Sequence, residues 1–271
     1  MKKTVISLFL CLLVGYTIGQ PGNIDTSFRV GTGFSSTVTA LATQPDNKII
    51  AGGLFTSYNG TEFKTLVRLL PNGAIDSSFN VGATGFNGTI KSIHVLPDTS
   101  VIVAGGFSML NSTNVYGIVK LDKNGNIDPA FDISNNINGA VNAMAVDVLT
   151  GNIYIGGTFT TVNGTSSKHI ARLLPNGDLD NSFAVGTGFT GTFGSAPVYS
   201  LFIQADNKLL VGGEFLFYQG MVASKLCRIK QNGDIDTAFA TNLGAGFDNI
   251  VYAIEQMADG KIMVEGEFTV L

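Results

Sequence analysis

Short apolar segments alternate with polar turns along most of the chain. Val38–Ala42 alternates weakly, and Lys48–Gly53 is a continuous apolar run typical of a strand buried on both faces. Leu66–Leu70 and Ile75–Phe79 follow, separated by a Pro-Asn-Gly turn of the kind that reverses a hairpin. No stretch has the sustained 3.6-residue periodicity and the caps of a helix. The pattern predicts four short strands in this unit and an essentially all-β chain.

The same unit recurs through the chain, because two markers repeat in phase. The first is Asp-x-x-Phe, with successive spacings of 51, 52, 52 and 56 residues, at Asp25/Phe28, Asp76/Phe79, Asp128/Phe131, Asp180/Phe183 and Asp236/Phe239. The second is a glycine pair before Phe, at Gly52-Gly53, Gly105-Gly106, Gly156-Gly157 and Gly212-Gly213, with a degenerate copy at Glu265-Gly266.

Four antiparallel strands in about fifty residues is the size of one blade of a β-propeller. The sequence therefore predicts an all-β propeller of four-stranded antiparallel blades. The paired glycines fit either a close approach of neighbouring backbones near the axis or a β-bulge. Because the Asp-x-x-Phe residues recur in every unit, we expect them to be structural.

The repeat resembles the delta-60 repeat family of exported bacterial proteins. The resemblance rests on Asp-x-x-Phe, Gly-Phe, a turn like Pro45-Asp46-Asn47-Lys48, Gly-Gly-x-Phe, and Arg-Leu before an Asn-Gly turn. It covers nearly the whole chain after the first twenty residues. It implies a β-propeller in a cell-surface context with no established activity, and it brings no catalytic residues.

The first nineteen residues have the pattern of a cleaved secretory signal peptide. Lys2 and Lys3 precede the apolar run Val5–Gly15, and small residues end at Gly19, which predicts cleavage before Gln20. A membrane anchor is the alternative, but the run is short for a span. We therefore expect a secreted or cell-surface protein, with no transmembrane segment after cleavage.

Residues 20–271 hold four complete repeats and a partial fifth. The fifth repeat contains no counterpart of the strands that carry Arg68, Lys120, Arg172 and Arg228. We expect an incomplete ring that forms the N-terminal part of a larger propeller. The alternative is a closed five-bladed ring completed by the segment Gly22–Phe28.

The charge pattern argues against several kinds of site. Charged residues make up 13% of the chain, the net charge is −4, and no basic cluster is present, so no nucleic-acid partner is expected. His94 and His169 have no metal-site spacing, and we predict no metal, no cofactor and no catalytic constellation. Asp122–Asp128 resembles a calcium loop, but its ligand set is incomplete, and a simple hairpin turn accounts for this segment in every copy of the repeat. Cys227 replaces Val or Ala in its sister repeats, so we expect a buried, inert thiol.

An Arg or Lys stands eight residues before each repeated Asp from Asp76 onward. Across a short hairpin loop the two side chains would face each other as an ion pair. Alternatively, the carboxylate accepts hydrogen bonds from nearby backbone N–H groups. Both interpretations make the Asp structural.

Function is expected where the repeats differ. The connection Thr190–Pro197 is enlarged, and the turn Leu216–Met221 is apolar where its counterparts are polar. We predict contact with a partner at Phe193, Phe217, Tyr218 and Met221. Glu214, Glu265 and Glu267 are the carboxylates that the repeat places near the axis.

The leading interpretation is a non-catalytic surface scaffold that contacts proteins or glycans. A second is export cargo bound to an outer-membrane secretion or surface complex. A third is a glycan-active propeller enzyme with acidic residues at the axis.

Overall fold

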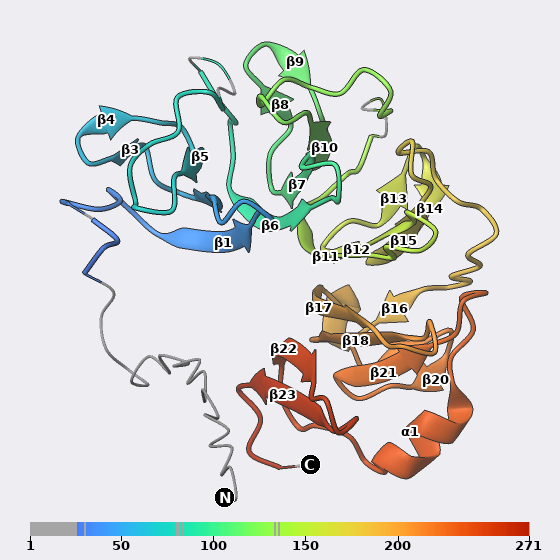
Figure 1. The fold of residues 1–271 in the computed structure, drawn as a ribbon. Helices are drawn as coiled ribbons and strands as arrows, with labels where there is room; N and C mark the ends of the chain where they lie inside the picture. The colour runs from blue at the N-terminus through green and yellow to red at the C-terminus, as the bar shows by residue number, and fades with distance from the viewer. Residues whose placement is uncertain are drawn as a thin grey trace, which may run out of the picture.

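The computed structural model describes residues 26–29, 31–79, 82, 84–132, 134 and 136–270. They form nine antiparallel sheets, of which four are small hairpin sheets and the five main ones follow one another in an arc (Figure 1). The five main sheets define the blades. We call these sheets blades one to five in chain order. The predicted signal peptide and Asp25 lie outside the described residues.

Each of the first four blades is a ladder of three strands, and the fifth contains two. The inner strands are β1 (Val38–Thr43), β6 (Ile90–Val95), β11 (Val141–Val146), β17 (Val198–Ile203) and β22 (Val251–Gln256). The middle strands are β2 (Ile49–Gly53), β7 (Val101–Gly105), β12 (Ile153–Gly157), β18 (Leu209–Gly213) and β23 (Ile262–Gly266). The outer strands are β5 (Leu66–Leu69), β10 (Ile118–Leu121), β15 (Ile170–Leu173) and β21 (Leu226–Ile229).

A short hairpin, each strand of which has two residues, connects the middle and outer strands of each complete blade. The hairpins are β3 (Ser57–Tyr58) with β4 (Thr61–Glu62), β8 (Met109–Leu110) with β9 (Thr113–Asn114), β13 (Thr161–Val162) with β14 (Thr165–Ser166), and β19 (Phe217–Tyr218) with β20 (Met221–Val222). In blade four, β16 (Phe189–Thr190) adds a third strand to this small sheet and is followed by the 3-10 helix η1 (Thr192–Gly194).

The β-propeller architecture is confirmed, but the fourth segment of each unit differs from expectation. Ile75 makes one bridge to Leu69, and the chain then turns instead of continuing as a strand. The Asp76 carboxylate accepts the N–H of Ser78 at 3.0 Å, which closes a turn and removes this backbone from the ladder. After Asp236 the chain forms the short helix α1 (Thr237–Leu243), which the sequence pattern did not predict.

Phe131, the phenylalanine of Asp-x-x-Phe in blade two, requires the same correction. It lies in a turn and not in a fourth strand, because its N–H donates to the carbonyl of Asp128 at 3.1 Å and bends the chain back. Phe131 is 3% exposed and belongs to a buried cluster that includes Ile153 and Ile155 of blade three. This side chain is therefore part of the packing between blades and presents no surface to a partner.

The paired glycines serve both of the roles considered for them. A Cβ on Gly52 would lie 2.6 Å from a methyl group of Ile90 in the next blade, so the first glycine permits blades to approach. A Cβ on Gly53 would lie 2.2 Å from the carbonyl oxygen of Thr37, where the register shifts in a bulge. In blade two the register places Ala104 and Gly105 in these positions, which corrects the pairing of Gly105 with Gly106.

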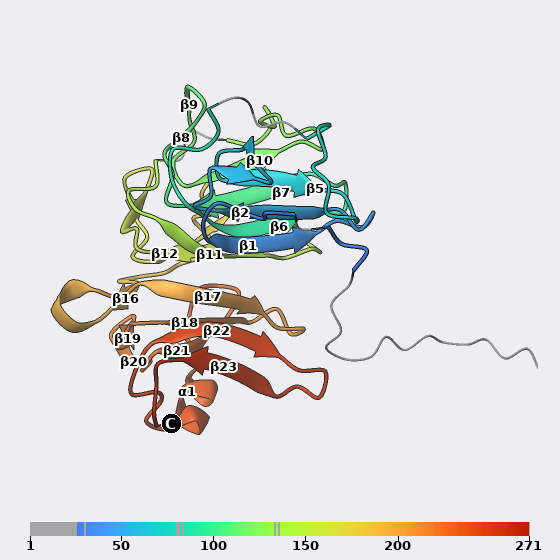
Figure 2. The same ribbon diagram turned by 90° about the vertical axis from the view of Figure 1, so that its left-hand side faces the viewer.

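The hydrophobic core lies mainly between blades. Inner strands of successive blades pack against one another, and Figure 2 shows β1, β6 and β11 side by side. Phe79, at the end of blade one, is 5% exposed and lies in one buried cluster with Ile90, Val101 and Val119 of blade two. Each Asp-x-x-Phe segment of blades one and two therefore fastens its own blade to the next.

The arc of described blades remains open between blade one and blade five (Figure 1). Contacts among inner strands run from β1 through β6, β11 and β17 to β22. Among the described helices, none is long and apolar enough to cross a membrane.

Candidate functional site

The Arg68–Asp76 pair of the repeat connects blade one to blade two. Arg68 Nε donates to Asp76 Oδ2 at 2.8 Å, while the other carboxylate oxygen accepts the N–H and hydroxyl of Ser78. The ion pair and the backbone hydrogen bond considered as alternatives are thus both present. Arg68 Nη1 also donates to the carbonyl of Lys123 in blade two at 2.8 Å. The guanidinium therefore connects three segments of chain.

The other copies of this pair are also ion pairs. Shortest nitrogen–oxygen distances are 2.9 Å for Lys120–Asp128, 2.7 Å for Arg172–Asp180 and 2.8 Å for Arg228–Asp236. The guanidinium carbons of Arg68, Arg172 and Arg228 lie 4.7, 5.0 and 4.7 Å from the ring centres of Phe79, Phe183 and Phe239. These repeated residues therefore form an internal unit of ion pair and aromatic ring.

The surroundings of Asp76 favour its charged form. Burial raises the pKa of this carboxyl, but hydrogen bonds from Ser78 and the nearby Lys48 and Arg68 cations hold the pKa well below its usual range. The pKa values of Asp180 and Asp236 are lowered by similar hydrogen bonds and cations, again against the effect of burial.

The segment that resembles a calcium loop is organised by internal hydrogen bonds. The Asp122 carboxylate accepts the N–H of Asn124 at 2.8 Å, the N–H of Asn126 at 2.9 Å and the Asn126 side chain at 3.0 Å. Within the part of the chain that the structure describes, no three His, Cys, Asp or Glu side chains converge as a metal site.

His94, His169 and Cys227 lie in three different blades. Burial lowers the pKa of both histidines, and His169 Nδ1 lies 3.2 Å from the carbonyl oxygen of Gly157. Cys227 is 1% exposed, and burial raises the pKa of its thiol, which disfavours the reactive thiolate.

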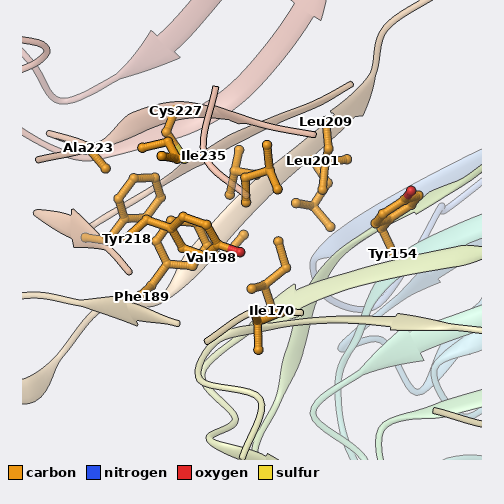
Figure 3. Close-up of a cluster of buried hydrophobic side chains, with 14 of the residues drawn as sticks. Tyr154, Ile170, Phe189, Val198, Leu201, Leu209, Tyr218, Ala223, Cys227 and Ile235 are labelled. Atoms are coloured by element: carbon orange, nitrogen blue, oxygen red, sulfur yellow. The ribbon is translucent and has the colours of Figure 1, made fainter. Parts of the chain in front are cut away.

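Tyr218, one of the predicted partner-contact residues, is buried, and that prediction is wrong. Its ring lies 4.6 Å from the ring of Phe189 in the core between blades three and four (Figure 3). Its hydroxyl donates to the carbonyl of Gly233 at 2.6 Å. Alternation along the strand turns Tyr218 inward when Phe217 points outward. Phe193 belongs to η1, but its side chain lies outside the described part of the structure.

Phe217 and Met221 lie on the blade-four hairpin, with 39% and 40% of their surfaces exposed. Val222, which sequence reasoning missed, is 60% exposed and pairs directly with Phe217. The positions matching Met221 and Val222 are polar in the other complete blades: Thr61 and Glu62, Thr113 and Asn114, Thr165 and Ser166. Comparison of the hairpins by register would have identified Val222. We call Phe217, Met221 and Val222 the apolar hairpin patch.

Two of the three predicted near-axis carboxylates share an environment. Glu214 and Glu267 follow the glycine positions of blades four and five. Burial raises the pKa of the Tyr199 hydroxyl, and the negative charges of these two glutamates raise it further. Glu267 accepts a hydrogen bond from Tyr252 at 2.9 Å, and the rings of Tyr199 and Tyr252 are 5.4 Å apart. Glu265 instead lies within β23, two residues before Glu267, and is exposed.

Antiparallel blades joined through their inner strands place the chain in the class of β-propeller repeat proteins. A family model for a β-propeller domain of unknown function, DUF5122, matches residues 44–79, 96–131, 150–183 and 204–239, just over half of the chain. The chain belongs to this family. Each match runs from the turn before a middle strand to the Phe of Asp-x-x-Phe.

Solved structures of other propellers share the fold at low sequence identity. The extracellular domain of BT4673 from B. thetaiotaomicron is 15% identical with a TM-score of 0.52, over 87% of this chain and 27% of that one. The WD40 propeller domain of Doa1 is 17% identical with a TM-score of 0.55, over 86% and 62%. The Xanthomonas campestris gluconolactonase XC5397 is 9% identical with a TM-score of 0.50, over 83% and 68%.

This chain thus spans less than two thirds of the length of the BT4673 and Doa1 propeller chains. The neighbours include an enzyme and an extracellular domain, so they establish the fold and leave the activity open. No curated protein matches the sequence.

Proposed function

We propose that this protein is a non-catalytic recognition module of the cell exterior that binds a protein partner through the apolar hairpin patch. The observation that carries the proposal is the exposure of Phe217, Met221 and Val222 on one hairpin, where matching positions of the other blades are mostly polar. A feature needed for folding would recur in every blade. A feature confined to one blade is better explained by a contact made at that blade.

The patch is held on a rigid support. Tyr218 anchors β19 in the core, and Phe189 and Thr190 of β16 pair with this strand on its other side. A rigid support lowers the entropy lost on binding, because few side chains need to be ordered. Burial of exposed apolar surface contributes roughly 25 cal/mol per Å².

The N-terminal pattern supports a position outside the cell, because charged, apolar and small residues follow in the order of a secretory signal. The extracellular domain of BT4673 shares the fold, which is compatible with this position. The repeat motifs favour assignment to the delta-60 type of propeller. Protein–protein contact is preferred because the patch is apolar.

The proposal is tested with a photo-crosslinking amino acid placed at position 217 of the protein in its native host. The matched control carries the same amino acid at position 161, because Thr161 holds the corresponding position of the blade-three hairpin. We expect a discrete adduct from position 217 that is absent from position 161. The adduct should disappear when Met221→Thr and Val222→Ser are added. No adduct from position 217, or the same adduct from both positions, would overturn the proposal.

A further inference from the structure

The turn between the inner and middle strands of blade three differs from its counterparts. In blade one, the N–H of Gln44 donates to the carbonyl of Lys48 at 2.8 Å and closes this turn. In blade three, the N–H of Asp147 donates to the carbonyl of Asn152 at 2.9 Å, across one residue more. The same hydrogen bond identifies the matching positions in the other blades. Asn152 therefore corresponds to residues that are lysine in three blades and serine in one: Lys48, Ser100, Lys208 and Lys261.

In blades one and four, the lysine at this position pairs with the repeated aspartate. Lys48 Nζ lies 3.2 Å from Asp76 Oδ2, beside the guanidinium that pairs with the same carboxylate. Blade four has the same arrangement, with the ammonium 3.3 Å from the carboxylate. In blade three, Asn152 supplies no ammonium, and the ion pair of Asp180 with a described residue is the one with Arg172. Blade three thus lacks a cation that blades one and four hold at this point.

A cavity lies at this point, in the seam between blades three and four. Asp147, Asn152 and Tyr154 line it from blade three, and Gln231 and Asn232 line it from blade four. Its volume is about 360 Å³. That is within the range of roughly 300–1,000 Å³ for sites that bind small molecules. All of the residues that line the cavity are polar, so it suits a ligand with a polar or charged group.

The carboxylate of Asp147 makes the cavity negative. Burial raises the pKa of this carboxyl, but hydrogen bonds from Thr150 and the turn backbone, with the nearby Arg172 cation, bring the pKa below its usual range. The carboxylate is therefore charged at neutral pH. The matching residues of the other blades are neutral: Gln44, Leu96, Gln204 and Met257. Among the five blades, a negative charge at this position is thus specific to blade three.

Arg172 also lines the cavity, but it leaves little for an anion to bind. Its Nε donates to Asp180 at 2.7 Å, and its Nη2 donates to Ser182 at 3.0 Å. Its Nη1 donates to the carbonyl of Gln231 at 2.6 Å and to the hydroxyl of Tyr154 at 3.3 Å. All three nitrogen atoms therefore already bind groups of the protein. With a carboxylate close by, the cavity favours a cation over an anion.

Two exposed apolar side chains flank the cavity. Val148 and Leu149 lie in the turn directly after Asp147, which lines the cavity, and they are 70% and 84% exposed. In a bound organic cation, an alkyl chain that leaves the cavity can pack against these side chains. An inorganic cation could not use them, because it has no apolar part. The surroundings therefore fit an ammonium that carries an alkyl chain.

We propose that this cavity binds a primary alkylammonium group, which is the lysine side chain of another protein or a free alkyl amine. The ammonium takes the position that the Lys48 ammonium holds in blade one, next to the carboxylate of Asp147. Hydrogen bonds between charged groups are stronger than neutral ones, so the carboxylate selects an ammonium over an alcohol of the same shape. The turn lies at the opposite end of the blade from the hairpin, so this site is separate from the apolar hairpin patch.

The test is a titration of the isotope-labelled protein with n-pentylammonium chloride, followed by NMR. We expect the backbone amides of residues 148–152 and 231–232 to shift as the probe saturates the site. Asn152→Lys should abolish these shifts, because the new side chain carries its own ammonium into the cavity. The control Thr165→Lys adds the same charge at the other end of blade three and should bind the probe like the unmodified protein.

Two further comparisons do not depend on the added lysine. Asp147→Asn should weaken binding of the probe about tenfold, because a hydrogen bond between charged groups becomes one to a neutral amide. The alcohol n-pentanol, which has the same chain without the charge, should leave the amides unshifted. The proposal is overturned if n-pentanol shifts the same amides, if n-pentylammonium shifts none of them, or if either Asn152→Lys or Asp147→Asn leaves binding unchanged.

A capped Gly-Lys-Gly peptide distinguishes the two sources of the ammonium. Tighter binding of the peptide than of n-pentylammonium supports a lysine side chain of another protein as the ligand. Equal or weaker binding of the peptide supports a free alkyl amine.

Discussion

At the residue scale, the repeated Asp is the most constrained polar group of the unit. Asp76 is 7% exposed and receives hydrogen bonds from a guanidinium, a backbone N–H and a hydroxyl. Such bonds to charged groups contribute about 1.5–3 kcal/mol each. Sequence spacing identified the pair because the loop between Arg68 and Asp76 is short. It could not identify the bond from Arg68 to Lys123, since that contact depends on how the next blade packs.

The lowered pKa values of Asp76, Asp180 and Asp236 predict loss of stability in acid. A group with a lower pKa in the folded state than in the unfolded state stabilises the fold above the unfolded pKa, about 3.9 for Asp. That stabilisation declines as the pH falls below about 4 toward the folded pKa values. Urea unfolding should therefore show a lower midpoint at pH 3 than at pH 7.

The triple variant Asp76→Asn/Asp180→Asn/Asp236→Asn isolates these groups. It should be less stable than the unmodified protein at pH 7, and its midpoint should fall by a smaller amount between pH 7 and pH 3. Equal decreases in the two proteins would show that other carboxyls cause the acid sensitivity.

At the element scale, the bulge between inner and middle strands defines each blade. The register shifts at the same place in all five blades, opposite the second glycine position. The first position is Ala104 in blade two, where this residue packs in one buried cluster with Val141 of the next blade. The second is glycine in every blade because it faces backbone of the same sheet.

Gly157→Ala should destabilise the fold by about 1–3 kcal/mol, the usual cost of forcing an extra group into a packed site. Its Cβ would lie 2.0 Å from the carbonyl oxygen of Ala140, and backbone cannot move aside as a side chain can. Gly106→Ala is the control, because its Cβ would be 3.6 Å from the nearest atom, the Cβ of Ala140. Thermal unfolding of the two variants gives the comparison. Equal melting temperatures would contradict the assigned role of the second glycine.

At the scale of the whole molecule, stability depends on seams between blades. The largest buried clusters combine residues of adjacent blades, so each blade is stabilised by its neighbours. Blade five has one described neighbour, and its sheet has two strands. In a chain of these 271 residues, blade five is therefore expected to open more readily than blades two to four.

Hydrogen exchange followed by mass spectrometry should reveal this difference. After correction for intrinsic rates, amides of β22 and β23 should exchange faster than those of β11 and β12, which lie between two complete blades. Equal protection of the two pairs of strands would mean that blade five gains its stability from within the blade.

The sequence by itself determined the class of the fold, the repeat length and the residues of the ion pairs. These features arise from alternation, turn chemistry and short loops, which act between neighbours in the chain. Only the tertiary structure decided that Tyr218 is buried while Val222 is exposed, and that the segment after each Asp, Phe131 included, turns away from the ladder. These features depend on which face of a strand packs against another blade about fifty residues away in the sequence. The alternation of apolar and polar residues within one strand does not indicate which face that is.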